Sequence, residues 1–442
     1  MESWWQWLWI WIWIWIWAGA QLLFWCGGAR LVRRRWRPGH RKADRAVTSH
    51  RPGKPGPGNA AAAGGAVTFF RPLKTFDAPR LGDLLRFVEQ LQPDDEVIFG
   101  VEDIETVLTP SLLAVAARDP RVKVIHCRAS GLPNRKVSKL VQMTPYAGRD
   151  RWVLFDSEAV PGPALLREVR TQLDGATAVM AAYRFGDLDT LPQLADAMGT
   201  LTFLLMGDAW SRLAGRPTAV FGACLGLTRH MWEALAGWER FAHDLADDFQ
   251  IGRALRERGF GLYLCRRPVL LRADALDWPE FWAHQRRAAV TYRVSKPAGF
   301  AGAGVVFTLP LLISLGLICG RITWLVVPAV LLMRVAVQMH FNRSLKIEVP
   351  PGLVLALSPV LVFTEFTAWL ASWFSRRIRW GSQEIEVRSG GVVREIRTRR
   401  HPPGLGTAGS AASVRLAAAS RRTLASALRV ITTRRARAAP PT

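Results

Sequence analysis

The sequence predicts an α/β protein with a doubly wound, mainly parallel sheet, accompanied by helices that enter a membrane. Two observations lead to this fold class. Apolar residues are concentrated at the start of the chain and between Gly299 and Phe374, whereas the stretch from Val67 to Pro297 has the composition of a water-soluble domain. Within that stretch, short apolar runs alternate with segments of helical periodicity, which is typical of parallel sheets covered by helices.

The first segment, residues 3–27, is apolar over the length that a helix needs to cross a bilayer. Its alternating Trp and Ile residues would suit a strand, but a lone strand cannot satisfy its backbone in lipid, so we predict a transmembrane helix. Ten Lys or Arg residues and a single acid, Asp44, follow between Arg30 and Lys54. This charge places residues 28–66, a flexible linker rich in Pro, Gly and Ala, on the cytoplasmic side.

Residues 67–297 carry the alternating pattern. The predicted strands and helices are, in order, VTFF, LGDLLRFVEQL, EVIFGV, SLLAVAA, RVKVIHC, RKVSKLVQM and RWVLFD. Ligands of such sheets bind at the carboxyl ends of the strands. Acidic residues stand at these ends, since Glu102 and Asp103 follow EVIFGV, and Asp156 and Glu158 follow RWVLF. These acids are the first candidate functional residues.

Residues 298–375 form a predicted C-terminal membrane block of two or three helices. Residues 299–319 and 322–339 predict a transmembrane hairpin. A third stretch, residues 351–374, contains Pro359 and Glu365 and has basic residues at both ends. We favour a re-entrant or interfacial segment there, with a further crossing as the alternative. Residues 376–442 are basic and are predicted to be mostly disordered.

The formal net charge of +24 does not indicate a nucleic-acid-binding protein. The basic residues adjoin the apolar segments, where they set orientation and contact anionic lipid headgroups, and no nucleic-acid-binding signature accompanies them. The five cysteines have no metal-ligand spacing, which indicates buried thiols in a reducing compartment. We therefore predict a multi-pass membrane protein, of the bacterial inner membrane, with its soluble domain on the cytoplasmic side.

Two further polar clusters complete the candidates, Asp247-Asp248 and the HQRR segment from His284 to Arg287. Transfer of a sugar from a nucleotide diphosphate needs such groups. The departing diphosphate needs cationic partners, a Mg²⁺ or Mn²⁺ ion needs oxygen ligands, and the attacking hydroxyl needs a carboxylate to take its proton. The residue types alone do not distinguish a functional acid from a solvated loop residue or a helix cap.

Seven motifs between Val67 and Gly391 resemble those of a known family. They are FFRPLK, VIFGVED, NRKVSKL, LFDSEAV, FGACLGLTRHMWEALAGW, LADDFQIG and HQRRA. In this order they resemble the ceramide glucosyltransferase group of the family 2 glycosyltransferases, which also includes hopanoid-associated transferases. The resemblance implies a GT-A fold, a UDP-sugar donor, a divalent cation (Mg²⁺ or Mn²⁺), inversion at the anomeric carbon and a membrane lipid such as ceramide as the acceptor.

The resemblance also implies roles for single residues. Asp103 would bind the nucleoside, and Asp156 would approach the diphosphate and the metal, with Glu158 as the second metal ligand. Lys136 would neutralise phosphate charge. Asp248 would deprotonate the acceptor hydroxyl.

The HQRRA motif implies that His284, Gln285 and Arg287 lie at the donor, with Arg287 facing the phosphates. His284 and Gln285 would equally suit polar positions of a helix at the membrane interface. Two residues depart from the family pattern, because Glu158 replaces an Asp and Ala288 replaces a Trp. These departures keep two alternatives open beside a hopanoid acceptor: a catalytically impaired membrane scaffold and, more weakly, a polysaccharide synthase.

Overall fold

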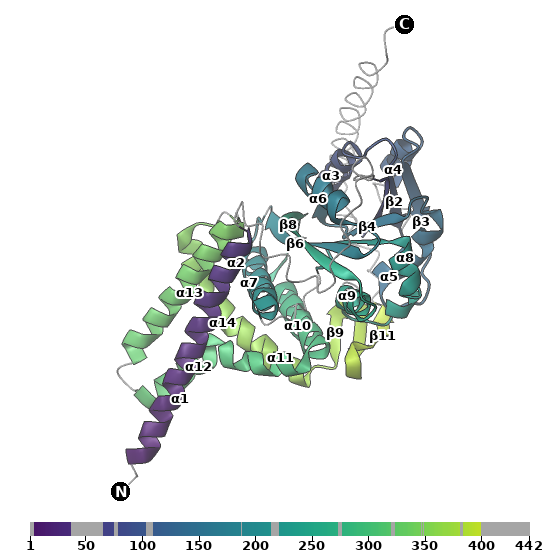
Figure 1. Cartoon of the computed structure of the whole chain (residues 1–442). Coiled ribbons are helices and arrows are strands. Elements are labelled where there is room, and N and C mark those ends of the chain that lie inside the picture. Colours follow the sequence, from purple (N-terminus) through teal and green to yellow (C-terminus); the bar gives the residue numbers. More distant parts are fainter. Residues whose placement is uncertain are drawn as a thin grey trace, which may run out of the picture. The chain divides into compact units, whose positions relative to one another are not determined.

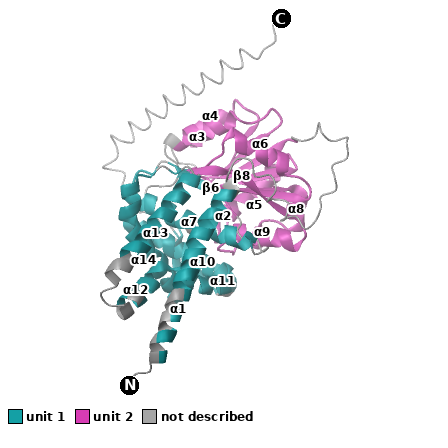
Figure 2. Cartoon of the chain, turned by 60° about the vertical axis from the view of Figure 1, so that its left-hand side comes forward, with its two compact units in different colours: residues 1–49, 184–220, 272–397 teal, residues 50–183, 221–271, 398–442 magenta. Residues whose placement is uncertain are grey.

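The computed structural model (Figure 1) describes residues 4–36, 65–74, 78–102, 109–186, 188–213, 221–272, 276–319, 323–345, 347, 349–380 and 383–398. The predicted linker beyond residue 36, the nucleoside-binding candidate Asp103 and the tail from residue 399 lie outside these ranges. The chain forms two compact units, which Figure 2 colours separately. Unit 1 comprises residues 1–49, 184–220 and 272–397, and unit 2 comprises residues 50–183, 221–271 and 398–442.

Unit 2 is built on a mixed eight-stranded sheet of order β3-β2-β1-β4-β7-β6-β8-β5. Strands β3, β2, β1 and β4 are parallel neighbours, whereas β7 is antiparallel to both β4 and β6, and β5 is antiparallel to β8. The strands are β1 (Val67–Pro72), β2 (Glu96–Val101), β3 (Val122–His126), β4 (Arg151–Phe155), β5 (Ala159–Val160), β6 (Thr177–Gly186), β7 (Cys224–Thr228) and β8 (Gly261–Arg272).

Both faces of this sheet are covered, which is why its strands read as unbroken apolar runs. Alternate residues such as Phe69 and Phe155 join a core with apolar side chains of helices α3, α4 and α6. On the opposite face, Trp152 packs against Trp232, which is carried by α8. The helices of unit 2 are α3 (Ala78–Val88), α4 (Thr109–Ala116), α5 (Arg135–Met143), α6 (Pro163–Gln172), α8 (Arg229–Ala234) and α9 (Asp247–Glu257).

Unit 1 consists mainly of helices. They are α1 (Trp4–Leu22), α2 (Gly28–Trp36), α7 (Leu191–Leu213), α10 (Trp278–Ser295), α11 (Pro297–Gly302), α12 (Thr308–Cys319), α13 (Thr323–Leu345) and α14 (Pro351–Phe374). A π-helical segment, Leu23–Gly27, joins α1 to α2. The helical path thus continues past the predicted end at residue 27, and α2 packs against α7 and α13.

The third apolar stretch of the C-terminal block is one helix, α14, of 24 residues that runs through Pro359. Among the described residues, α14 is the helix long and apolar enough to span a membrane, and α11 with the start of α12 forms a second candidate that is bent by 45°. Glu365 of α14 accepts hydrogen bonds from Arg334 of α13 at 2.7 and 2.9 Å. This partner lets an acid lie inside an apolar helix, so Glu365 does not require the re-entrant segment that we favoured.

The first part of the predicted disordered tail has regular structure. Strands β9 (Arg377–Trp380), β10 (Gln383–Val387) and β11 (Val393–Thr398) form a sheet of order β11-β10-β9. Ile378 and Ile385 are buried and paired in the register, while Arg379 pairs with Glu384. The alternation of apolar and charged residues explains why this basic segment forms strands.

Candidate functional site

Helix α5 places Lys136 at the first candidate cluster, in unit 2. The helix begins after Asn134, whose side-chain oxygen accepts a hydrogen bond from the backbone N–H of Val137 at 3.2 Å. Asn134 is fully buried, and its backbone N–H donates to the carbonyl of Ala242 at 3.1 Å. This cap stabilises the helix and ties its first turn to the segment that leads into α9.

Lys136 connects two of the predicted acids. Its Nζ lies 2.7 Å from Oδ1 of Asp156, directly after β4, and 3.9 Å from Oδ2 of Asp247, in the first turn of α9. Burial disfavours the charged ammonium, but the attraction of Asp156 and Asp247 outweighs it and raises the pKa of Lys136 above its usual range. Lys136 is therefore a permanent positive charge among carboxylates.

Asp248 lies beside this ion pair and is held by two backbone donors. The N–H of Gly222 donates to its Oδ2 at 3.0 Å, and the N–H of Phe249 donates to its Oδ1 at 2.8 Å. The carbonyl of the same Gly222 accepts a hydrogen bond from Lys136 at 3.3 Å. A Cβ at position 222 would lie 2.7 Å from Oδ2 of Asp248, so only glycine permits this approach.

The surroundings of Asp248 shift its proton affinity toward neutrality. Burial, followed by the negative charge of Asp247, raises the pKa of Asp248 to about 7, although the charge of Lys136 opposes the shift. A carboxylate with a pKa near the working pH both holds and releases protons readily, which suits a general base. The cluster of Lys136, Asp156, Asp247 and Asp248 can therefore accept a proton next to a fixed cation.

Glu158, the predicted second metal ligand, has a different partner. It forms an ion pair with Lys74, which follows β1. Burial alone would raise the pKa of Glu158, but the charge and hydrogen bond of Lys74 outweigh burial and lower the pKa to about 2. The buried Arg71 fixes the same loop by donating to the carbonyls of Ser157 and Ala159 at 3.3 and 2.8 Å.

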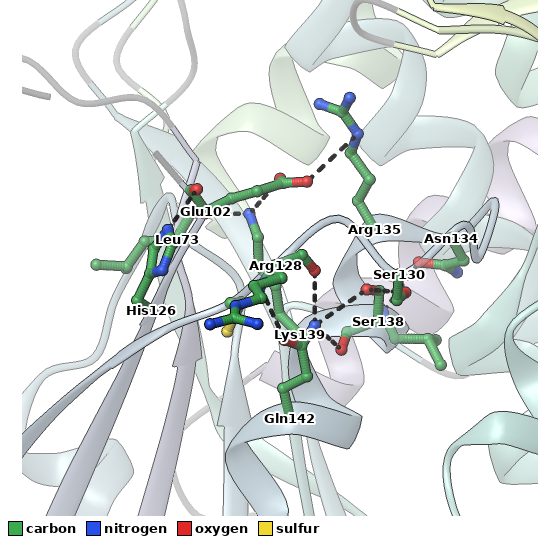
Figure 3. A network of polar contacts seen from close by, with 12 residues as sticks. Leu73, Glu102, His126, Arg128, Ser130, Asn134, Arg135, Ser138, Lys139 and Gln142 are labelled. Atoms are coloured by element: carbon green, nitrogen blue, oxygen red, sulfur yellow. Dashed lines mark hydrogen bonds and ion pairs between the residues drawn. The ribbon is translucent and has the colours of Figure 1, made fainter. Parts of the chain in front are cut away.

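A second polar network lies where β1 and β2 end (Figure 3). Nζ of the buried Lys139 donates to the carbonyl of Leu73 at 2.6 Å and lies 3.2 Å from Oε2 of Glu102. His126 approaches the carbonyl of Glu102 at 3.2 Å, and Arg135 lies 3.9 Å from its carboxylate. Glu102 precedes Asp103, so this network fixes the described end of the segment in which the nucleoside-binding residue was predicted.

The residues of the HQRRA motif belong to helix α10 of unit 1. His284 Nδ1 lies 2.6 Å from Oδ1 of Asp196, and Gln285 Nε2 donates to the same oxygen at 2.7 Å. Arg287 is half-buried on the same helix. Asp196 was not among the predicted residues, because an acid within a helix reads as a solvated position. The flanking apolar residues Leu194 and Met198 are a signal that could have identified it as buried.

The side chains present fit a divalent cation only if the ligand supplies most of the oxygen atoms. Within the described part of the chain, no three His, Cys, Asp or Glu side chains are grouped as a metal site. Asp156 keeps 32% of its side-chain exposure beside Lys136, whereas Glu158 keeps 15% and is paired with Lys74. Because Mg²⁺ is commonly held by one or two carboxylates together with substrate phosphates, Asp156 is the better-placed ligand.

The model of the family described as glycosyl transferase family 21 matches residues 43–393. That range includes every candidate residue named above. Among curated proteins, none matches the chain significantly.

Solved structures of glycosyltransferases show a more distant similarity. A mannosyltransferase from Pyrobaculum calidifontis, in complex with GDP-Man and Mn²⁺, is 17% identical, with a TM-score of 0.43 over 82% of this chain and 98% of that chain. Glucosyl-3-phosphoglycerate synthase from Mycobacterium tuberculosis, in complex with Mn²⁺, UDP and glucosyl-3-phosphoglycerate, is 18% identical, with a TM-score of 0.34 over 56% and 85% of the two chains. These TM-scores are below 0.5, so the family match alone identifies the chain.

Proposed function

This chain belongs to glycosyl transferase family 21, and we propose that it is an inverting hexosyltransferase that moves a sugar from a UDP-sugar to the hydroxyl of a membrane lipid such as ceramide. We propose a GT-A type fold for unit 2 and a location in the bacterial inner membrane with unit 2 in the cytoplasm. The observation that carries the proposal is the pairing of Asp248, whose pKa is raised to about 7, with the neighbouring Lys136–Asp156 ion pair.

Asp248 is the proposed base. Its carboxylate takes the proton of the acceptor hydroxyl while the hydroxyl oxygen attacks the anomeric carbon on the face opposite the diphosphate. The bond between that carbon and the phosphate oxygen breaks, and its electron pair leaves with the UDP, so the configuration inverts. The hydrogen bonds from Gly222 and Phe249 hold both carboxylate oxygens in place, which reduces the reorganisation that the reaction needs.

Lys136, Asp156 and Asp103 are the proposed donor-binding residues of unit 2, with Asp103 at the nucleoside. Lys136 already neutralises Asp156 and would meet the negative charge that develops on the diphosphate. Asp156 would hold a Mg²⁺ or Mn²⁺ ion. Glu158 is a weaker candidate ligand because it forms an ion pair with Lys74. When bound, such an ion would supply Lewis-acid stabilisation of the diphosphate. The similar transferases that carry Mn²⁺ and a nucleotide or nucleotide-sugar accord with this proposal.

We also propose His284, Gln285 and Arg287 of helix α10 as donor-binding residues, as the HQRRA motif implies, with Arg287 as a cation for the phosphates. A lipid acceptor accords with the apolar helix α14 in the same unit, which meets the length and composition of a membrane span. The basic residues that follow α14, such as Arg377 and Arg379, are exposed and suit contact with anionic headgroups. A hopanoid hydroxyl would be attacked by the same chemistry.

A second candidate function is that of a membrane scaffold that binds the donor but transfers poorly. Two observations favour it. The second acid of the metal motif, Glu158, is engaged by Lys74, and Ala288 stands where the family pattern has Trp. Tight binding of UDP-sugar without transfer to any lipid would support the scaffold.

The test is transfer by membranes that contain the full chain. Membranes are incubated with radiolabelled UDP-glucose or UDP-galactose and Mn²⁺, with ceramide or hopanoid added, and the labelled lipid is identified by mass spectrometry. Asp248→Asn serves as the inactive control, and EDTA tests the cation. We expect one labelled glycolipid that disappears in Asp248→Asn and with EDTA. An equal yield of product from Asp248→Asn would refute the assigned base.

A further inference from the structure

Unit 1 contains a buried carboxylate that is hydrogen-bonded to a half-buried histidine. Asp196 of α7 is 4% exposed, and its Oδ1 receives both Nδ1 of His284 at 2.6 Å and Nε2 of Gln285 at 2.7 Å. Gln285 Nε2 also donates to the hydroxyl of Thr200 at 3.2 Å. Burying a carboxylate is costly unless donors compensate it, and here two neighbouring residues of α10 do so.

The arrangement fixes which nitrogen of His284 carries the proton. An ionised carboxylate can only accept hydrogen bonds, so Nδ1 must carry the hydrogen that points to Asp196. In the neutral ring, Nε2 is then left with a lone pair. The side chain of His284 keeps 29% of its exposure, and no other described residue forms a polar contact with the ring. The contact at Nδ1 thus fixes the ring and leaves Nε2 of the neutral His284 as a hydrogen-bond acceptor.

The neighbourhood of this acceptor is apolar on one side. Phe281, one turn before His284, belongs to a buried cluster with Met198 of α7 and Leu361 of α14. A Cβ on Gly199 would approach Leu361 at 3.3 Å, so α7 and α14 are closely packed beside Gln285. A ligand that uses Nε2 must bring a hydroxyl to the edge of this apolar cluster.

We propose that Nε2 of the neutral His284 ring accepts a hydrogen bond from a substrate hydroxyl, and that Asp196 is the positioning residue that holds the ring in place through Nδ1 and fixes the tautomer with its hydrogen there. The hydroxyl comes either from the lipid acceptor or from the sugar of the donor, and this inference rests on the proposed transferase function. The competing view is that Asp196 only joins α7 to α10. The two views differ in what happens when the outward nitrogen alone is changed.

Three variants test the roles of the two ring nitrogens of His284 separately. His284→Asn keeps an amide donor near Nδ1 but removes the outward acceptor, whereas His284→Gln keeps an acceptor oxygen near Nε2. Asp196→Asn replaces a carboxylate, which can only accept, by an amide that can also donate to Nδ1, so the ring is no longer confined to the tautomer with its acceptor at Nε2. Asp208→Asn is the matched control, because Asp208 is also 4% exposed on α7 but pairs with Arg212 of the same helix.

Dissociation constants of UDP-glucose and of a short-chain ceramide are measured on the purified full chain, together with the thermal midpoint. We expect His284→Asn and Asp196→Asn to weaken one of the two ligands by about ten- to a hundredfold. His284→Gln should retain most of the affinity, and Asp208→Asn should leave both constants unchanged. The weakened ligand identifies the source of the hydroxyl.

If Asp196→Asn lowers the thermal midpoint but leaves both dissociation constants unchanged, the inference is overturned, and the contact between Asp196 and His284 is only structural. Equal losses in His284→Gln and His284→Asn would also overturn it, as would a wild-type chain that binds neither ligand. Binding does not depend on turnover. A wild-type chain that binds but transfers no sugar therefore refutes only the proposed function, and the comparison of the variants still tests this inference.

Discussion

Replacing Lys136 by Met removes the cation from the candidate cluster and leaves three acids, Asp156, Asp247 and Asp248, near one another. At 2.7 Å, the attraction between Lys136 and Asp156 is about 1.5 kcal/mol at the dielectric of water and about 6 kcal/mol at an effective dielectric of 20. Lys136 and Asp156 keep 23% and 32% of their side-chain exposure, so screening and desolvation reduce this attraction. We expect a net loss of about 2 kcal/mol.

For a unit of this size, that loss corresponds to a decrease of about 4–8 °C in the thermal midpoint. The assay is thermal unfolding of the purified full chain in detergent at pH 7.5. Because folding raises the pKa of Lys136, its contribution to the free energy of unfolding is fully present at pH 7.5. This contribution is lost only at strongly alkaline pH, where the ammonium of the folded protein loses its proton. Lys136→Arg is the matched control that keeps the charge.

The double variant Lys136→Met with Asp156→Asn tests the cause. Removing one carboxylate along with the ammonium relieves the repulsion, so the double variant should be more stable than Lys136→Met alone. Equal midpoints for the wild type and Lys136→Met would refute the view that Lys136 is held by the acids. A double variant less stable than the single variant would refute the electrostatic explanation.

Two further outcomes follow from the surroundings of Asp248. Gly222→Ala should lower kcat by about a hundredfold, since the added Cβ would lie 2.7 Å from Oδ2 of Asp248 and would displace the carboxylate. An unchanged kcat in transfer assays would contradict the fixed position of Asp248. Asp248→Asn should raise the thermal midpoint at pH 8. Burial and the charge of Asp247 raise the pKa of Asp248 from 3.8 to about 7, so the charged carboxylate destabilises the fold increasingly as the pH rises through this window. The gain should disappear below pH 3.8, and an equal gain at pH 3 and pH 8 would show that charge is not its cause.

The parallel part of the sheet could be predicted from sequence, because β1 to β4 are short buried apolar runs separated by helical segments. The antiparallel insertion of β7 between β4 and β6 could not, since an apolar run carries no information about direction. In the same way, the apolar character of residues 351–374 predicted a segment that the structure shows as one helix long and apolar enough to span a membrane. Only the structure shows that Arg334, on another helix, pairs with Glu365 and so permits a plain helix there.

The approach of Lys136, Asp156 and Asp248 was anticipated by the family motifs, and the family match confirms that the chain is a glycosyltransferase. The donor and the lipid acceptor remain predictions. Periodicity could not reveal the partner of Glu158, because Lys74 lies 84 positions away in sequence. Asp196 was missed for a similar reason, since its burial depends on α10 meeting α7.

The pH dependence of kcat/KM for transfer, compared between the wild type and Asp247→Asn, tests the central claim that Asp248 is the base. With the pKa of Asp248 raised to about 7, the wild-type rate should fall tenfold per pH unit below neutrality. Removing the charge of Asp247 lowers that pKa, so the acid limb of Asp247→Asn should move to lower pH. An acid limb that stays near pH 7 in Asp247→Asn, or a wild-type rate that does not change between pH 5 and pH 8, would contradict the account.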